Sequence, residues 1–131
     1  MNRIAMLAVV SVALLKVCTP SHAGEVIAHP SVVLSAEEVR ELFMGDKQLA
    51  GSLKLVPVDN GAQHADFLVK VLQMDPTRYT ARWIKKAFRD GLSAPMTKGS
   101  DAEVAAFVRA TPGAVGYVST ASVGVQTLQK Y

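Results

Sequence analysis

The sequence predicts an α/β fold in which strands and helices alternate along the chain and pack in layers. Two observations support this prediction. Short apolar runs bounded by turn residues alternate with segments whose apolar residues recur at helical spacing. Helix caps and helix stop signals separate these segments. Because the 131 residues contain no internal repeat, low-complexity segment or linker, we expect the folded part to form one domain.

Residues 1–23 are predicted to be a signal peptide that takes no part in the fold. Arg3 gives the segment a positive start, and the apolar run over residues 4–15 is too short to span the roughly 30 Å core of a bilayer. The Ser-His-Ala sequence that ends at Ala23 offers a cleavage site. An uncleaved anchor helix is the alternative. We expect cleavage, export of the protein and a mature domain over residues 24–131.

Cysteine content and charge limit the chemistry of this domain. Cys18 is the only cysteine, and the bulky Val17 before it disfavours a lipidation site. After cleavage the domain has no cysteine and two histidines, so we expect no disulfide, no metal site and no cofactor. It keeps 12 basic and 11 acidic residues, a net charge of +1, without a block of like charge. We therefore expect no nucleic-acid partner.

A strand followed by a capped helix is predicted at the start of the domain. Residues 25–29 form a short apolar run that Pro30 ends. Ser35 and Glu38 have the spacing of a capping box, in which the hydroxyl and the carboxylate bond each other's backbone amides. The helix is expected to end at Gly45 and to bury one face, which consists of Val39, Leu42 and Phe43.

A second strand and a second helix follow a polar loop over residues 46–52. The strand is predicted over residues 53–58, and Asp59-Asn60-Gly61 is predicted to end it. The next helix places on one face three apolar residues, Phe67, Val71 and Leu72.

A third helix is predicted to open at Asp75, with Pro76 at the favoured first position, and to end at Gly91. Residues 91–100 are predicted to be a loop. The helix carries Ile84 and three aromatic residues, Tyr79, Trp83 and Phe88. We expect this aromatic stripe to be core, although it could line a ligand groove.

The last part of the chain predicts a helix, a sharp turn and two strands. Asp101 is the expected helix cap, and Thr111-Pro112-Gly113 stops the helix. Residues 114–118 form the next strand, and residues 125–128 form the last one. Gly116 lies at the centre of its strand, which indicates that another part of the molecule approaches the backbone closely there.

Four segments of this chain, in order and register, resemble phosphate-type periplasmic solute-binding proteins, the substrate-binding components of ABC transporters. They are LSAEEVRELFMG (34–45), LVPVD (55–59), FLVKVL (67–72) with the later Tyr79 and Trp83, and SDAEV to PGAVGYV (100–118). The resemblance covers nearly the whole domain and is best for short members with one lobe. It implies a single lobe of a type 2 periplasmic-binding-protein-like fold, a mixed sheet flanked by helices, and binding of phosphate or a similar anion.

The best candidate site is the turn between the second strand and the second helix. Amide groups at a helix N-terminus attract anions, so we expect Asn60, Gly61, Gln63 and His64 to bind one. The family's turn resembles R-x-D-x-S-G-T, whereas this chain lacks the arginine and both hydroxyl side chains there. An ordinary turn and helix cap is the alternative interpretation.

Two weaker candidates involve basic or hydroxyl residues. Residues 97–100 precede a helix and offer a second anion pocket. The third helix also carries a run of cations that could attract an anion or a partner protein, with an ordinary solvated face as the alternative: Arg78, Arg82, Lys85, Lys86 and Arg89.

No nucleophile elbow, phosphate loop or catalytic pair of carboxylates occurs in the sequence, so we expect no enzyme activity. The function predicted is anion binding, with a membrane permease or another periplasmic protein as partner. A homodimer is a further arrangement that would supply a second lobe. The alternative function is a periplasmic accessory or sensory domain that binds no small ligand.

Overall fold

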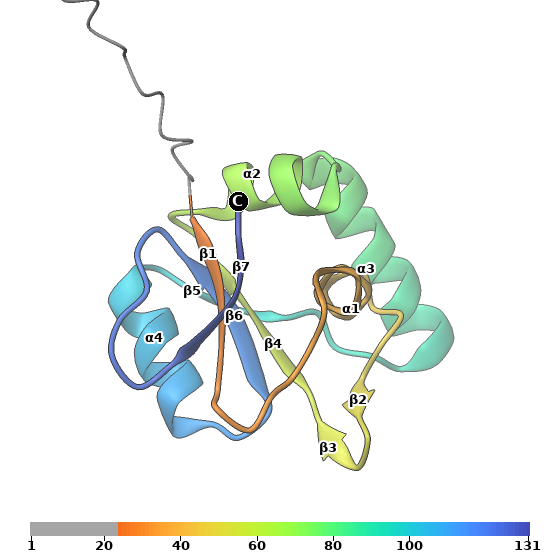
Figure 1. Cartoon of the computed structure of the whole chain (residues 1–131). Coiled ribbons are helices and arrows are strands. Elements are labelled where there is room, and N and C mark those ends of the chain that lie inside the picture. The colour runs from red at the N-terminus through yellow and green to blue at the C-terminus, as the bar shows by residue number, and fades with distance from the viewer. Residues whose placement is uncertain (1–23) are drawn as a thin grey trace, which may run out of the picture.

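A mixed five-stranded sheet forms the centre of the computed structural model, which describes residues 24–131 (Figure 1). The predicted signal peptide lies outside these residues. The strands of this sheet are β1 (Glu25–Ala28), β4 (Val56–Asn60), β5 (Met96–Lys98), β6 (Ala114–Val118) and β7 (Gln126–Lys130). Two further strands, β2 (Leu49–Ala50) and β3 (Leu53–Lys54), pair with each other in a separate small sheet. The helices are α1 (Ala36–Phe43), α2 (His64–Phe67), the π-helix η1 (Leu68–Leu72), α3 (Pro76–Asp90) and α4 (Asp101–Ala110).

The sheet has the strand order β5-β4-β6-β1-β7. The central strand β4 is parallel to both of its neighbours, β5 and β6, whereas β1 is antiparallel to both β6 and β7. The connection from β4 to β5 runs through α2, η1 and α3, and the connection from β5 to β6 runs through α4. The carboxyl ends of β4, β5 and β6 therefore meet at one edge of the sheet.

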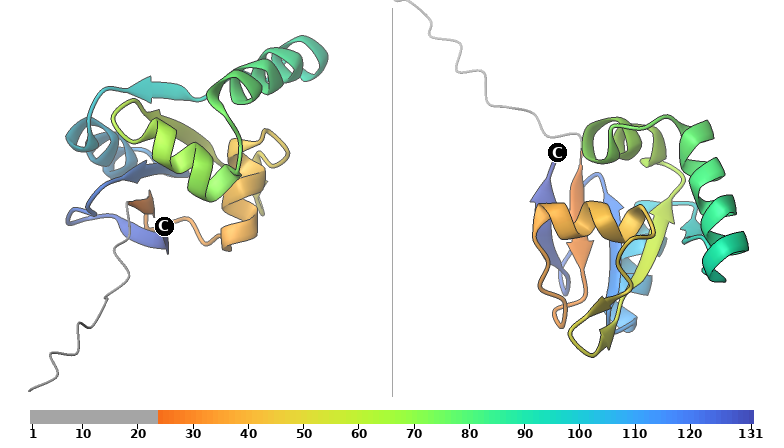
Figure 2. Two further views of the ribbon diagram at one scale, coloured as in Figure 1. Left: turned by 90° about the horizontal axis from the view of Figure 1, so that it is seen from above. Right: turned by 90° about the vertical axis from the view of Figure 1, so that its right-hand side faces the viewer.

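Helices cover both faces of the sheet, and each face has its own hydrophobic core (Figure 2). On one face, α1, η1 and α3 pack on Val26, Ala28 and Tyr117. On the other face, α4 packs on Ile27 and Val118. Alternate residues of β1 thus point into different cores, as the two-residue period of a strand requires. A sheet covered by helices on both faces confirms the α/β prediction.

The predicted helix caps are right for α1 and α3 and wrong for α4. Ser35 and Glu38 form the expected capping box. Ser100, not Asp101, caps α4, because the Ser100 hydroxyl accepts the Glu103 amide at 3.3 Å. The Asp101 carboxylate instead turns away from its own helix and accepts hydrogen bonds from Ser119 and Asn60.

Several predicted boundaries are also wrong. The strand predicted over residues 53–58 is two strands, β3 and β4, and β4 continues through Asp59 and Asn60. The predicted loop over residues 91–100 contains β5, and the loop over residues 46–52 contains β2. The helix after β4 is a short α-helix that continues as a π-helix. The strands β2, β3 and β5 are only two or three residues long, so pairing with a neighbouring strand rather than local periodicity determines them.

Gly116 is confirmed as a point of close approach. A Cβ atom there would lie 2.7 Å from a methyl carbon of Val104 in α4 and 2.8 Å from one of Val58 in β4. Only glycine lets α4 pack this tightly on the sheet. Gly113 has φ +83° and ends the turn after α4, as the Pro112-Gly113 sequence predicts.

We predict that Gly116→Ala destabilises the protein by about 1–3 kcal/mol, because the added methyl group forces α4 and β4 apart. Gly99→Ala is the matched control, since a Cβ there meets only Glu103 Oε2 at 3.6 Å. Urea unfolding of both variants measures the difference. Equal stability of the two variants would contradict the close packing of α4 on β6.

Candidate functional site

Two buried polar side chains end the central strand of the sheet. Asp59 is 4% exposed and Asn60 is fully buried. They lie at the carboxyl end of β4, between the ends of β5 and β6. Open α/β sheets bind their ligands outside this edge, so these residues mark the part of the fold that is suited to a site.

The Asp59 carboxylate is held by two tyrosines. The Tyr79 hydroxyl of α3 donates to Oδ2 at 2.8 Å, and the Tyr117 hydroxyl of β6 donates to Oδ1 at 2.9 Å. His64 Nδ1 lies 2.9 Å from the Tyr117 oxygen. Because the Tyr117 proton is directed to Asp59, this network assigns the hydrogen of His64 to Nδ1, which donates to Tyr117. The four side chains form one connected chain of hydrogen bonds.

Burial dominates the ionisation of this cluster. It raises the pKa of Asp59, while the hydrogen bonds from Tyr79 and Tyr117 and the nearby His64 act in the opposite direction. Burial and the neighbouring carboxylate also raise the pKa of both tyrosines. Both hydroxyls therefore stay protonated and remain donors to Asp59.

Asn60 has a structural role. Its amide nitrogen donates to Asp101 Oδ1 at 2.7 Å and to the Tyr117 carbonyl at 2.9 Å. Its side-chain oxygen accepts the Ala62 amide at 3.0 Å. Asp101 in turn accepts the Ser119 amide at 3.0 Å, so Asn60 connects β4 to the start of α4 and the end of β6.

The turn after β4 also uses its own backbone amides. The Gly61 amide donates to the Lys98 carbonyl at 2.8 Å, and the Gln63 amide donates to the Asn60 carbonyl at 3.1 Å. With the Ala62 amide bound to Asn60, three successive N–H groups point into the protein. This arrangement differs from a turn that presents its amides to a ligand.

A cleft of about 410 Å³ lies beside this turn, between α3 and β5. Asp59, His64 and Tyr79 line its polar end. The remaining walls come from α3 and from the segment before and within β5, and they include Thr80, Ile84, Ala87, Pro95 and Thr97. An apolar cleft with a few polar groups at one end is the usual form of a small-ligand site.

The structure brings two of the four predicted anion-binding residues to this cleft. Gly61 and His64 line it, whereas Asn60 points into the protein. The Gln63 side-chain oxygen is buried, with no hydrogen-bond partner among the described residues. The four predicted anion-binding residues do not include Asp59 or Tyr117. Tyr79 is predicted to be core or to line a ligand groove, and it lines this cleft, whereas Thr97 is predicted for the second anion pocket and lines this cleft instead. A carboxylate directly after an apolar strand is the signal that could have identified Asp59.

The second predicted anion pocket, over residues 97–100, is already occupied by protein groups. The Gly99 amide donates to the Glu103 carboxylate at 3.0 Å, and Ser100 caps α4. Asp101 and Glu103 also place two negative charges in the first turn of α4. These acidic groups oppose anion binding there.

Metal-ligating side chains do not gather anywhere in residues 24–131: no group of three or more His, Cys, Asp or Glu residues is placed to hold an ion. Within the same part of the chain, no helix has the length and apolar character needed to cross a membrane.

Comparison with known proteins gives a fold and no family. No family model matches the sequence, and no curated protein matches it. The structure is similar to an ABC-type phosphate transport receptor from Vibrio cholerae, with a TM-score of 0.53 and 14% sequence identity. The match covers 82% of this chain and 46% of the receptor chain, so the chain spans less than half of the receptor's length. At this identity the likeness shows the fold alone, a mixed sheet flanked by helices that resembles part of the receptor chain.

Burial of Asp59 predicts an unusual pH dependence of stability. Its pKa is higher in the folded than in the unfolded chain, so ionisation destabilises the fold as pH rises from about 4 through the folded-state pKa. A difference of one pKa unit corresponds to about 1.4 kcal/mol. We expect Asp59→Asn to gain stability relative to the wild type over this range in urea unfolding.

Asp101→Asn is the contrasting variant. Burial acts to raise the pKa of Asp101, but hydrogen bonds from Ser119 and Asn60 outweigh it and lower that pKa. Ionised Asp101 therefore stabilises the fold above its unfolded pKa, and its contribution is lost as pH falls through the folded-state value. We expect the deficit of Asp101→Asn to shrink on acidification. A pH-independent difference between Asp59→Asn and the wild type would contradict the buried, ionisable carboxylate.

Proposed function

We propose that this chain is an exported, non-catalytic solute-binding domain, and that it takes a small oxyanion of the phosphate class in the cleft between α3 and β5. The observation that carries the proposal is the position of this cleft. It lies at the carboxyl ends of parallel strands, in a fold similar to that of a phosphate transport receptor.

Side chains along the cleft, rather than the backbone amides of the turn, would supply the donors for an anionic ligand. His64 lines it, and the hydrogen bond from Nδ1 to Tyr117 fixes the ring. Thr97 and Thr80 add hydroxyl groups on two opposite walls. Because the Nδ1 hydrogen is already donated to Tyr117, His64 can donate to an anion only from Nε2, which carries a hydrogen as well when the ring is doubly protonated.

Two features make the proposed binding weak. The charge of Asp59 lies beneath the polar end and opposes an anion, although both carboxylate oxygens are already bonded to tyrosines. The chain also matches less than half of the receptor, so a second lobe that would close over the ligand is absent from the match. Water then remains in the cleft and screens each contact. We expect a Kd on the order of millimolar.

The second candidate is a periplasmic accessory domain that contacts a membrane permease or another protein and binds no small ligand. The inward-pointing amides of Gly61, Ala62 and Gln63 favour it, because a phosphate turn needs these groups free for the ligand. Under the first proposal, a homodimer could also complete the cleft with a second copy of the chain.

Titration calorimetry with phosphate, and with sulfate beside it, tests the binding proposal. We expect saturable phosphate binding, loss of binding in His64→Ala, and several-fold tighter binding in Asp59→Asn, which removes the opposing charge and keeps the shape. Melting temperatures of the variants, measured without ligand, separate lost binding from lost folding. Absence of heat and of thermal stabilisation at millimolar phosphate would favour the accessory domain.

Export is tested separately. We expect the protein recovered from the periplasm to begin at Gly24, because the predicted cleavage follows Ala23. Intact mass measurement decides this. A mass that includes residues 1–23 would contradict the signal peptide and support the anchor helix.

A further inference from the structure

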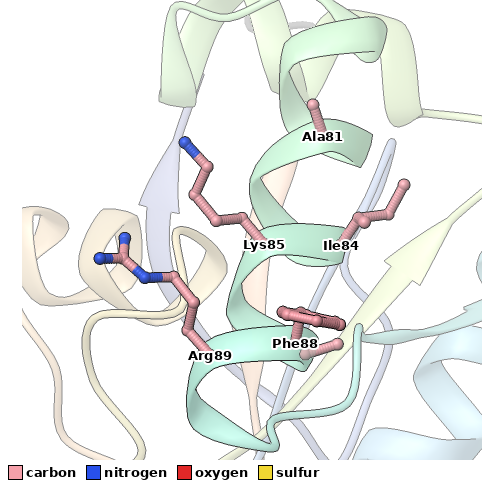
Figure 3. Close-up of a pocket in the computed structure, with 6 residues that line it drawn as sticks. Ala81, Ile84, Lys85, Phe88 and Arg89 are labelled. Atoms are coloured by element: carbon pink, nitrogen blue, oxygen red, sulfur yellow. The ribbon is translucent and has the colours of Figure 1, made fainter.

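The outward face of α3 is apolar and uncovered. Tyr79 and Trp83 hold the opposite face in the core. On the outer face Ile84 is 66% exposed and Phe88 is 92% exposed, and the helix projects away from the sheet (Figure 2). The prediction that the aromatic stripe is core is therefore right for Tyr79 and Trp83 and wrong for Phe88. An open hollow lies over this face, lined by Ala81, Ile84, Lys85, Ala87, Phe88 and Arg89 (Figure 3).

The spacing of this face is that of a helix-pairing seam. Thr77, Ala81, Ile84 and Phe88 follow one another at intervals of four, three and four residues. This is the a/d pattern with which one helix packs its side chains between those of another. The seam thus alternates a small side chain, Ala81, with large apolar ones, Ile84 and Phe88, which follow it along the helix (Figure 3).

Unpaired cations border one side of the seam. Arg82 and Lys86 are bound to Asp46, at 2.8 and 3.0 Å, and belong to the packing against α1. None of the ion pairs within residues 24–131 includes the three cations nearest the seam. These three exposed residues are Arg78, Lys85 and Arg89, and in Figure 3 Lys85 and Arg89 extend to one side of the helix while Ile84 and Phe88 extend to the other.

These charges argue against a second copy of the chain as the occupant. An antiparallel pair of α3 helices would place two Lys85 side chains together, and a parallel pair would place Lys85 beside Thr80 or Ala87. Neither arrangement offers an acidic partner. A lipid surface fits less well too, because only two large apolar side chains are available and the cations border only one side of them.

We propose that α3 docks an acidic amphipathic helix of another protein. The partner helix contributes an apolar a/d seam that packs on Ala81, Ile84 and Phe88. It also carries Glu or Asp at the flanking positions that face Arg78 and Lys85. Apolar contact then supplies affinity and the charge match supplies selection among helices.

Binding of two synthetic helical peptides to the full domain tests this proposal. Both peptides have leucine at a and d; one has Glu at the flanking positions and the other has Lys. By fluorescence anisotropy we expect the acidic peptide to bind at least about tenfold more tightly than the basic one. The double reversal Arg78→Glu/Lys85→Glu is expected to invert this preference. The matched control, Lys54→Glu/Lys70→Glu, changes the net charge equally at exposed sites outside α3 and is expected to keep it.

Shortening a single apolar side chain to alanine tests the apolar contact between the two helices. Phe88→Ala is expected to weaken the acidic peptide about tenfold, whereas Val123→Ala, at the same 92% exposure, leaves binding unchanged. Equal binding of both peptides, or no binding of the acidic one, overturns the proposal. So does a dimer in sedimentation velocity that Phe88→Ala dissociates, which assigns the face to a second copy. Binding to phosphatidylglycerol vesicles in place of the acidic peptide assigns it to a membrane.

Discussion

Burial of Asp59 and Asn60 at the end of β4 is the constraint on which this end of the molecule depends. A carboxylate and an amide inside a protein must be hydrogen-bonded, or they cost more free energy than a small domain can tolerate. Tyr79 from α3 and Tyr117 from β6 meet this need for Asp59, and Asp101 from α4 meets it for Asn60. Two adjacent residues thus fix the positions of three other elements. The Tyr117 ring also stacks on Phe67 at 3.8 Å, which joins the polar network to the core.

The same network explains why the turn after β4 differs from an anion-binding turn. Asn60 accepts the Ala62 amide and, through its carbonyl, the Gln63 amide, so the turn closes on itself. The backbone amides that a phosphate turn would offer are used here for structure, so a ligand in the cleft would contact side chains such as His64 and Thr97. A ligand here meets fixed side chains more than backbone amides. Selectivity for a ligand would then depend on the side chains that line the cleft and on the charge of Asp59.

The sequence predicts well those features that depend on residues close together in the chain, such as helix caps and turns. Ser35 and Glu38 cap α1, Asp75 caps α3, and Gly113 and Gly116 have the roles that their positions imply. The features that were predicted wrongly are mostly ones that depend on residues far away in the sequence. Asp101 is an excellent cap by type, but Asn60 and Ser119 compete for its carboxylate. Strand β5 exists because β4 pairs with it, and no local pattern contains this information. Phe88 differs, because it lies about 140° around the helix from Trp83 at about 100° per residue, so the helical period could have separated it from the buried face.

Helix α3 connects the cleft with the uncovered face, which gives the two features a shared physical basis. Ile84 and Ala87 line both the cleft and the hollow over the outer face. A helix docked on this face would lie along the rim of the cleft, reduce the access of water and strengthen every polar contact to a ligand inside. Tyr79 and Trp83 anchor α3 through Asp59 and through the Phe43 carbonyl, so the helix would present both surfaces without moving. A docked partner helix would in this way shield the ligand from water, as a second lobe would. Ligand and partner would then bind with positive cooperativity.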